Sequence, residues 1–323
     1  MGRICRRSLL AIGAVLLLCG GAVAQDYPNR AVKIVVPFPA GGSNDIIARI
    51  VAQKLGERYG QPVVVENRGG AGGNIGAEAV ANAEADGYTL LLTAPPPLTI
   101  NAALYKTLSF DPPKAFAPVA LIASVPIVLV VNNALGVRNV GELVALARAK
   151  PGTLNFGSSG IGSTNHLAGE LLKTMAGIDI VHVPYRGAAP AMNDLIAGQV
   201  PFMFDNIPAV LPQVQGKVIT AIAVAGAKRA DALPGVPAIA ETIAGFDASA
   251  WFGLVAPAKT PAPTLAKLRS EIKTILRTPD VQKRFGELGA EPGTVSGDAF
   301  GQFLAEETTK WSKIIQASGA TVK

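Results

Sequence analysis

The stretch VKIVVPFPAGGSNDIIARIVAQKLGERYG, residues 32–60, decides the fold class of this chain. Its first five residues are mostly apolar and β-branched, a pattern typical of a strand that is buried on both faces of a sheet. Apolar residues then recur at helical spacing from Ile46 to Leu55, which predicts a helix with Ser43 as its N-cap. A buried strand that runs through a short turn into an amphipathic helix is typical of α/β proteins.

The same order of apolar run, turn and helix recurs along most of the chain. We expect strands at Val32–Val36, Val63–Val65, Thr89–Thr93, Ile127–Val131, Thr153–Phe156, Ile180–Val183, Phe202–Phe204, Ile219–Val224 and Phe252–Ala256. A second helix is expected from Ser163, and Thr278-Pro279 predicts an N-cap followed by a first-turn proline. Because strands alternate with helices, the sequence predicts parallel sheets joined by right-handed crossovers.

The length of the chain predicts two domains, since 323 residues with 49% hydrophobic content exceed what one core usually holds. No low-complexity linker separates them, so we expect strands to cross between the domains, at Pro118–Val131 and Phe246–Ala256. The first domain would then be discontinuous, formed by residues 25–125 and 246–323, and the second would be formed by residues 126–245. The expected architecture is two α/β domains with a cleft between them.

The first 24 residues have the organisation of a secretory signal peptide. Arginines at positions 3, 6 and 7 precede the apolar run LLAIGAVLLLC, and Ala22-Val23-Ala24 is a small-residue cleavage site. The apolar run is too short for a membrane span. We therefore predict a mature chain that begins at Gln25 and is exported to the periplasm. The adjacent arginines leave Sec and twin-arginine export both open.

Removal of this segment changes the chemistry available to the mature protein. Cys5 and Cys19 both leave with it, which excludes a disulfide, a thiolate nucleophile and a sulfur-ligated metal. The mature balance is 26 basic against 23 acidic residues, without a basic run, so nucleic acid is not an expected partner. His166 and His182 lie sixteen residues apart and form no metal-binding pair. We predict no metal, no cofactor and no catalytic residue.

Three glycine-rich turns, at residues 37–45, 66–78 and 156–166, each follow a predicted strand and open a helix. Ligands of open α/β sheets bind at this end of the strands. Glycine lets main-chain N–H groups approach a ligand closely, and a helix N-terminus adds unpaired donors and partial positive charge. Converging turns of this kind predict a site for an oxyanion, most simply a carboxylate. The alternative is that the glycines serve only tight turns.

A dinucleotide site is a weaker interpretation of the second turn. It requires an acidic residue at the end of the next strand to hold the ribose, but that strand ends Leu92-Thr93-Ala94-Pro95. A secreted α/β hydrolase-like enzyme acting on carboxylate esters is the alternative from another functional class. No G-x-S-x-G elbow is present, which counts against it. A ligand-sensing module for a signalling partner also remains open.

Two further polar features lie at expected strand ends. Tyr185-Arg186-Gly187 follows the strand at Ile180–Val183, and Asp205 follows the strand at Phe202–Phe204. An acid at the mouth of an anion site suggests discrimination among ligands, for example by binding an amine, a hydroxyl or a water. Capping of the next helix is the equally weighted alternative for Asp205. For His166, a structural hydrogen bond and a ligand contact both remain possible.

Several motifs together resemble one family. VPFPAGGSND, ENRGGAGGNIGAE, NFGSSGIGSTNHLAGELL, VPYRGAAPAMNDLIAGQVPFMFD, KRADALPGVPAIAE and WFGLVAPAKTP appear in the order found in Bug-type extracytoplasmic solute receptors, the binding proteins of tripartite tricarboxylate transporters. The resemblance covers essentially the whole mature chain. It implies a type II periplasmic binding protein fold, a small organic acid as ligand, and delivery to the large and small membrane subunits of a permease by a monomeric receptor.

The resemblance also implies where the ligand binds. The first turn is expected to hold one carboxylate through main-chain groups and ordered waters, and the second domain is expected to hold the rest. The candidate ligand-binding residues are Phe38, Ala40, Gly41, Gly42, Ser43, Asp45, Gly72, Gly73, Thr93, Ser158, Ser163, Thr164, His166, Tyr185, Arg186, Gly187, Ala188 and Asp205.

The chain departs from the family's usual pattern at two places. Gly69 stands where the family usually has proline, and the loop after the third strand reads TAPPPLTINAAL instead of being rich in serine and threonine. Pro95-Pro96-Pro97 removes main-chain donors from that part of the cleft wall. We therefore hypothesise that the ligand has an apolar or aromatic body.

Overall fold

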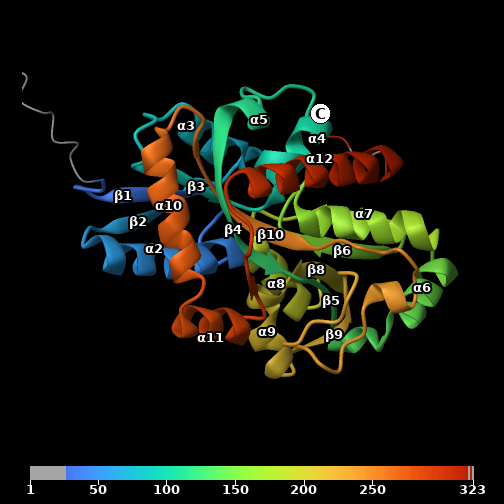
Figure 1. Cartoon of the computed structure of the whole chain (residues 1–323). Coiled ribbons are helices and arrows are strands. Elements are labelled where there is room, and N and C mark those ends of the chain that lie inside the picture. Colours follow the sequence, from blue (N-terminus) through green and yellow to red (C-terminus); the bar gives the residue numbers. More distant parts are fainter. Residues whose placement is uncertain (1–26, 319–320, 322–323) are drawn as a thin grey trace, which may run out of the picture.

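The computed structural model describes residues 27–318 and residue 321 and contains two β-sheets flanked by helices (Figure 1). The predicted signal peptide, residues 1–24, and the predicted new N-terminus, Gln25, lie outside the described residues. Within the described part of the chain, no helix is long and apolar enough to cross a membrane.

The first sheet has six strands in the order β11-β4-β10-β3-β1-β2. Strand β1 pairs in parallel with β2 and β3, whereas β10 runs antiparallel to both β3 and β4. The bounds are β1 (Val32–Val36), β2 (Val63–Asn67), β3 (Thr89–Thr93), β4 (Phe116–Val125), β10 (Ala250–Pro257) and β11 (Glu291–Pro292).

The second sheet has five strands in the order β7-β6-β8-β5-β9. Strand β6 is parallel to β7 and β8, and β5 is antiparallel to β8 and β9. The bounds are β5 (Ile127–Asn132), β6 (Leu154–Ser158), β7 (Ile180–Pro184), β8 (Phe202–Asn206) and β9 (Ile219–Val224). Both sheets are therefore mixed, and the prediction of parallel sheets was wrong for the strands that cross between them.

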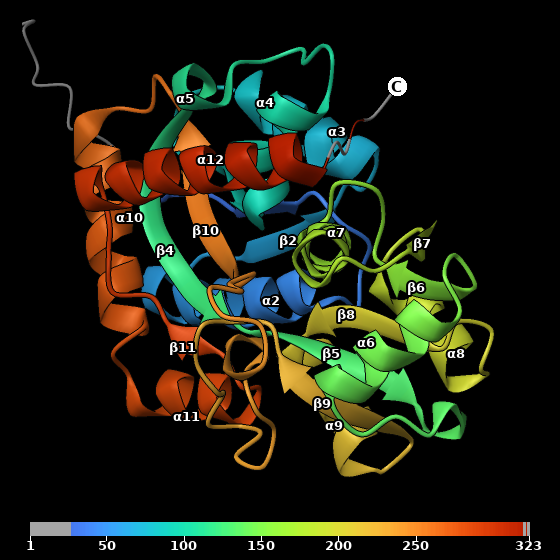
Figure 2. The ribbon, with the colours of Figure 1, turned by 90° about the vertical axis from the view of Figure 1, so that its right-hand side faces the viewer.

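The helices lie on both faces of each sheet (Figures 1 and 2). The helices of the first sheet are α2 (Ser43–Tyr59), α3 (Asn74–Ala81), α4 (Asn101–Leu104), α5 (Pro112–Ala115), α10 (Ala262–Ile275), α11 (Pro279–Glu287) and α12 (Asp298–Ser318). Those of the second sheet are α6 (Val140–Ala149), α7 (Thr164–Ala176), α8 (Ala188–Ile196) and α9 (Ile207–Gln215).

Burial on both faces explains the apolar composition of the strands in the first sheet. Ile34 and Val36 of β1 point toward α2 and α10, where they pack in one core with Ile47. Val35, between them, packs on the opposite face with Trp251 of β10 and apolar residues of α3 and α12. Successive side chains of a strand point to opposite faces, so a doubly covered strand must be apolar at nearly every position.

The two sheets are joined by chain segments that cross at closely spaced points. Strand β4 ends at Val125 and β5 begins at Ile127, with only Pro126 between them. The returning segment enters β10 through Ala248, whose N–H donates to the carbonyl of Ala225 at 2.8 Å, and the N–H of Ala225 in turn donates to the carbonyl of Ile127 at 2.7 Å. Two chain segments therefore cross between the sheets.

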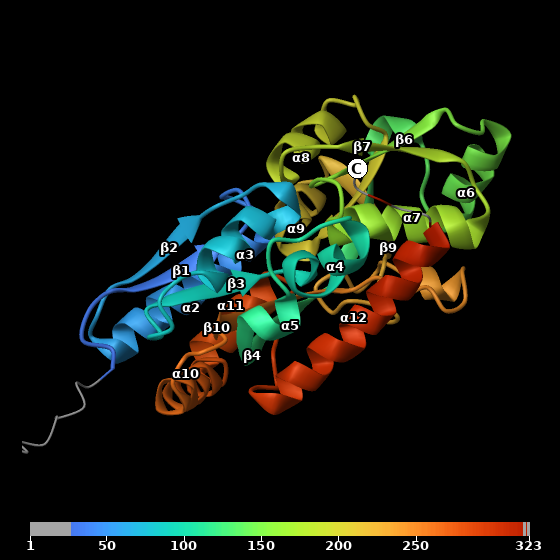
Figure 3. The same ribbon diagram turned by 90° about the horizontal axis from the view of Figure 1, so that it is seen from above.

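Helix α12 also spans both halves of the molecule (Figure 3). Its Phe300 packs in the core of the six-stranded sheet, whereas Trp311 packs in the core of the five-stranded sheet. Between them, Glu307 Oε2 accepts the indole N–H of Trp311 at 2.9 Å and that of Trp251 in β10 at 2.7 Å. A single buried carboxylate therefore links the two cores.

Helix starts match the predictions in part. Ser163 is the N-cap of α7, and its Oγ accepts the N–H of His166 at 3.1 Å, as predicted. Ser43 is not the N-cap of α2, because Gly42 adopts the extended cap conformation and Ser43 becomes the first helical residue. Thr278 caps α11 in conformation, but its hydroxyl donates to the carbonyl of Ile275 and does not accept a helix N–H.

We expect Gly169→Ala to destabilise the protein by about 1–3 kcal/mol, because a Cβ at this helical position would overlap the ring of Phe156. Gly286→Ala is the matched control, since Gly286 also lies in a helix but would place its Cβ in open space. That control should stabilise by about 0.5–1 kcal/mol through helix propensity alone. Urea unfolding of both variants measures the difference, and equal effects would contradict the packing argument.

Candidate functional site

Two adjoining cavities lie between the two sheets. The smaller one, which we call the inner cavity, has a volume of about 60 Å³. It is lined from the first half of the molecule by Phe38, Pro39, Gly42, Ser43, Asn44, Ala94, Pro96 and Phe252, and from the second half by Ser159, Ser163, Thr164, Asn165, Gly187, Ala188, Asp205 and Asn206. A ligand in this cavity would contact both halves at once.

The larger cavity, which we call the outer chamber, has a volume of about 620 Å³. It shares with the inner cavity the residues Phe38, Pro39, Pro96, Ser159, Ser163 and Gly187, so the two form one continuous cleft. Its remaining walls are Gly69, Gly70, Ala71, Gly72, Gly73, Tyr105, Gly160, Ile161, Pro184, Tyr185 and Arg186. The outer chamber is therefore wider and more apolar than the inner cavity, and Arg186 alone carries a charge among these described wall residues.

The N-termini of helices α2, α7, α8 and α9 meet at the inner cavity. Each follows the carboxyl end of a strand, and their first residues or N-caps, such as Gly42 and Gly187, line the cavity. Neither Gly42 nor Gly187 has a side chain to cap its helix. The first N–H groups of α2 and α8 therefore have no capping partner and face the cavity with the positive end of the helix dipole.

Buried polar side-chain atoms without a partner gather around the same cavity. Such atoms are Ser43 Oγ, Asn44 Oδ1 and Nδ2, Asn165 Oδ1, Asp205 Oδ2 and Asn206 Oδ1, and all five residues line the inner cavity. Each buried polar atom left unpaired costs about 1–3 kcal/mol. Because they come from both halves of the molecule, the arrangement fits a small polar ligand with acceptor and donor groups on opposite sides.

Asp205 is the charged residue of the inner cavity and is only 1% exposed. Its Oδ1 accepts the amide of Asn165 at 2.9 Å and the N–H of Asn206 at 2.8 Å, which leaves Oδ2 free. Burial raises the pKa of Asp205 to about 6, against the lowering effect of these two hydrogen bonds. The carboxyl group can therefore exchange a proton near neutral pH.

Hydrogen bonds from residues outside both cavities hold the first turn, residues 37–45, in shape. Asp45 Oδ2 accepts the N–H of Gly41 at 3.0 Å and the side chain of Arg49 at 3.0 Å, and Asn67 Nδ2 donates to the carbonyl of Phe38 at 3.0 Å. Burial would raise the pKa of Asp45, but the hydrogen bonds from Arg49 and Gly41 hold it below its usual range. Asp45 therefore positions the turn and does not line either cavity.

The second turn lines the outer chamber and not the inner cavity. The carbonyl of Gly72 accepts Asn101 Nδ2 at 3.1 Å, and Asn101 also bonds Asn74 Oδ1 at 2.6 Å. Gly73 has a φ of +92°, and a Cβ there would come within 2.8 Å of Pro97. Glycine is thus required for close packing of this turn against the proline-rich loop.

A partly buried Ser–His contact lies outside both cavities. Ser158 Oγ is 2.6 Å from His182 Nε2, and His182 stacks on His166 with ring centroids 3.9 Å apart. Burial, with a smaller contribution from His166, lowers the pKa of His182 to about 3. Ser158 is 0% exposed, and neither it nor the two histidines line a cavity. The contact therefore lacks the access that a nucleophile needs.

The structure brings together most of the predicted site residues. Phe38, Gly42, Ser43, Ser163, Thr164, Gly187, Ala188 and Asp205 line the inner cavity, and Gly72, Gly73, Tyr185 and Arg186 line the outer chamber. Ala40, Gly41, Asp45, Thr93, Ser158 and His166 line neither. The hydroxyl of Tyr185 donates to Asp194 Oδ2 at 2.7 Å, so that side chain is already paired.

Sequence reasoning missed several lining residues, above all Asn44, Asn165 and Asn206. Asn44 and Asn165 follow the N-cap of a helix, and Asn206 is itself an N-cap, so each one looks in the sequence like an ordinary helix-start residue. The available signal was position, because Asn44 and Asn165 lie inside turns already predicted to bind a ligand and Asn206 directly follows Asp205. Among the described residues, no cluster of potential metal ligands is present.

Two α/β halves joined by crossing strands, with a polar cavity between them, define a two-lobed ligand-binding protein. Comparison with known proteins gives the family. Residues 47–320 match the model of the tripartite tricarboxylate transporter family receptor, and this chain belongs to that family. The resemblance stated from the motifs is confirmed, and so is the predicted fold class.

Relatives and solved structures agree with this assignment. Protein BugT of Bordetella pertussis is 37% identical over 98% of this chain and 99% of its own length. The structure of R. palustris Rpa4515 with adipate is 39% identical, has a TM-score of 0.90, and matches 92% of this chain and all of its own. The structure of the periplasmic binding protein BugD is 34% identical, with a TM-score of 0.87 and the same coverage. The family is one of substrate-binding receptors.

Asp205→Asn should remove a pH dependence of stability. The folded protein keeps the proton of Asp205 up to about pH 6, whereas the unfolded chain loses it near pH 4. The ionisation of Asp205 therefore lowers the free energy of unfolding as pH rises from about 4 to about 6. Above about pH 6 the full loss is about 3 kcal/mol.

Chemical unfolding of the ligand-free wild type and of Asp205→Asn between pH 4 and pH 8 tests this. We expect the variant to gain stability relative to wild type as pH rises. A difference that stays constant over the whole range would show that Asp205 titrates normally.

Proposed function

We propose that this receptor captures a small organic mono- or dicarboxylate in the inner cavity. The observation that carries the proposal is the set of unpaired buried polar atoms from both lobes, arranged around helix N-termini. A carboxylate can accept from the free N–H groups at the start of α2 and from the amide of Asn44. A neutral Asp205 can donate to a ligand oxygen, and a charged one can accept from a hydroxyl or an amine.

Binding would proceed by closure of the two lobes about the crossing strands. Closure brings donors from both sides onto the ligand and removes water, which strengthens each hydrogen bond. We take residues 25–125 with 246–323 as one lobe and residues 126–245 as the other. A micromolar affinity corresponds to about −8 kcal/mol, which a few charge-assisted hydrogen bonds of about 1.5–3 kcal/mol each can supply after ordering costs.

Related proteins support a carboxylate ligand. Rpa4515 of R. palustris has been solved with adipate, and MatC of Rhodopseudomonas palustris, 32% identical to this chain, has been solved with bound malate. In this chain the outer chamber adds Tyr105 and Ile161 to an apolar wall that includes Pro96, which lines both cavities. This apolar wall favours a ligand whose carboxylate enters the inner cavity while an apolar or aromatic body lies in the outer chamber.

The remaining parts of the proposal concern the protein's setting. Export by a cleaved signal peptide at residues 1–24 would place a monomeric receptor in the periplasm, where it delivers its ligand to the large and small membrane subunits of a tripartite tricarboxylate transporter. We propose no catalytic activity, because Ser158 is fully buried and lines neither cavity. Turnover of generic esters by the purified protein would overturn this part.

A thermal-shift screen of the mature protein tests the ligand class. An organic acid at 100 times its dissociation constant should raise the free energy of unfolding by about 2.7 kcal/mol. Amines, sugars and nucleotides should leave the melting temperature unchanged. Stabilisation by sugars or nucleotides, with none from organic acids, would refute a carboxylate receptor.

Asn44→Ala should separate binding from stability. It should weaken binding of the acid found in the screen on the order of tenfold, since it removes one charge-assisted contact. Without ligand, the variant should be as stable as wild type or more stable, because the amide is buried and unpaired. The matched control is Asn193→Ala, an exposed helical asparagine outside both cavities, and calorimetry should show no change for it.

Asp205→Asn should alter the order of preference among amino, hydroxy and plain carboxylic acids, because an amide cannot exchange the proton that Asp205 does. Dissociation constants for one acid of each kind, with wild type and variant, measure the change. An identical order in both proteins would assign Asp205 to helix capping alone.

A further inference from the structure

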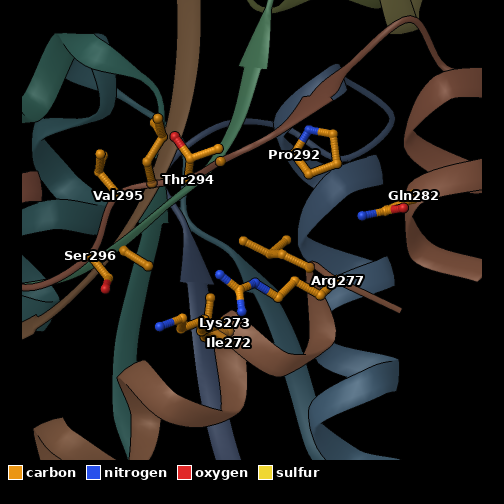
Figure 4. Close-up of a pocket in the computed structure, with 12 residues that line it drawn as sticks. Ile272, Lys273, Arg277, Gln282, Pro292, Thr294, Val295 and Ser296 are labelled. Carbon is orange, nitrogen blue, oxygen red and sulfur yellow. The ribbon is translucent and has the colours of Figure 1, made fainter. Parts of the chain in front are cut away.

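A second hollow lies on the six-stranded lobe, away from the cleft, between α10, α11 and the segment that contains β11. Its volume is about 620 Å³, and its described walls include no residue of the inner cavity or the outer chamber. We call it the edge groove. Its lining is formed by Ala120, Leu121, Ile272, Lys273, Leu276, Arg277, Gln282, Pro292, Gly293, Thr294, Val295 and Ser296 (Figure 4).

The edge groove carries positive charge without a matching acid. Lys273 of α10 and Arg277, two residues after the end of that helix, extend beside each other into the hollow, with Gln282 facing them from α11 (Figure 4). No described wall residue is acidic, and within residues 27–318 neither cation has an ion pair. The nearby acids Glu271 and Asp280 pair with Arg58 and Lys54 of α2. The charge is therefore available to a partner.

The upper wall of the groove is an unpaired sheet edge. The segment after β11 bonds β4 at alternate residues: the N–H of Gly293 donates to Ile122, the carbonyl of Val295 accepts from Leu121, and the N–H of Gly297 donates to Val119. Because strand residues alternate in direction, the main-chain groups of Thr294 and Ser296 face away from β4. Strand β11 is the last of the sheet order, and among the described residues no strand pairs with the far side of the segment that follows it.

We propose that the edge groove docks an extended acidic segment of a partner protein. The segment would add to the sheet edge through the main chain of Thr294 and Ser296, as in strand addition to an exposed edge. Its acidic side chains would pair with Lys273 and Arg277, and its alternate side chains would pack on Leu121, Leu276 and Val295. A small anion would satisfy the two cations but would leave the edge unpaired, so the groove fits a peptide better.

The test uses the mature chain and a fluorescent synthetic peptide of alternating glutamate and valine, with binding measured by anisotropy at low salt. We expect saturable binding that weakens as salt rises. The double variant Lys273→Glu/Arg277→Glu should weaken it on the order of tenfold or more through charge reversal. Lys267→Glu, on the same helix but outside the groove, is the matched control and should have a much smaller effect.

Two further peptides separate strand addition from simple charge attraction. A peptide with lysine in place of glutamate should not bind, and a glutamate–valine peptide methylated on alternate main-chain nitrogens should bind at least about tenfold more weakly. If charge reversal destabilises the fold, Lys273→Gln/Arg277→Gln gives the same comparison.

Several outcomes would overturn the proposal. They are no binding at millimolar peptide, equal binding by the double variant and Lys267→Glu, unchanged binding after main-chain methylation, or full displacement of the peptide by inorganic pyrophosphate at an ionic strength held constant. The last result would identify a small-anion site. None of these outcomes bears on carboxylate capture in the cleft, which the thermal-shift screen measures independently.

Discussion

The cleft of this receptor depends on polar groups that the fold buries without satisfying. Ser43 and Asn44 on one side and Asn165, Asp205 and Asn206 on the other present unpaired atoms to a cavity of about 60 Å³. Such groups cost about 1–3 kcal/mol each unless a ligand or water pairs with them. The folded protein therefore holds its cleft in a state that a matching ligand stabilises, and a strongly apolar core in each lobe offsets this cost. A ligand must contact both lobes to pair all of these polar atoms, because each lobe supplies only some of them.

The rest of the structure holds these two groups of atoms opposite each other. Strands β4 and β5 are separated by a single residue, and the hydrogen bonds from Ala248 to Ala225 and from Ala225 to Ile127 tie the returning segment to the same place. Close crossing points permit rotation of one lobe on the other but little translation. A rotation about these points would change the gap between the N-termini of α2 and α7 while preserving their alignment across the cleft.

Local sequence was sufficient to predict most of the strands but not their directions. The apolar runs at β1, β3 and β9 mark strands whose ends match the prediction, because burial on both faces requires apolar residues throughout. The antiparallel direction of β10 follows from its return out of the other lobe, which is a non-local fact. Ser43 failed as a cap because Gly42 already has the conformation that a cap needs.

The sequence likewise indicated some of the turns that line the cleft but not which cavity each turn reaches. The turns that follow β1, β6 and β7 reach the inner cavity, whereas the turn after β2 reaches only the outer chamber. Strand order is not encoded near the turn itself, so the sequence does not distinguish the turns that reach the inner cavity from the one that reaches only the outer chamber. Thr93 turns its hydroxyl to the carbonyl of Ala94, and only the folded chain distinguishes it from its neighbour Ala94, which lines the cavity.

The two tryptophans that hydrogen-bond to Glu307 give the protein an intrinsic fluorescence probe. The chain has two tryptophans, and both donate their indole N–H to the same carboxylate oxygen, one from the core of each lobe. Indole emission responds to the charge and polarity around the ring. Because Trp311 packs in the core of the five-stranded sheet, a rotation of that lobe would change the surroundings of its ring, and the intrinsic fluorescence of the unlabelled protein would report the movement.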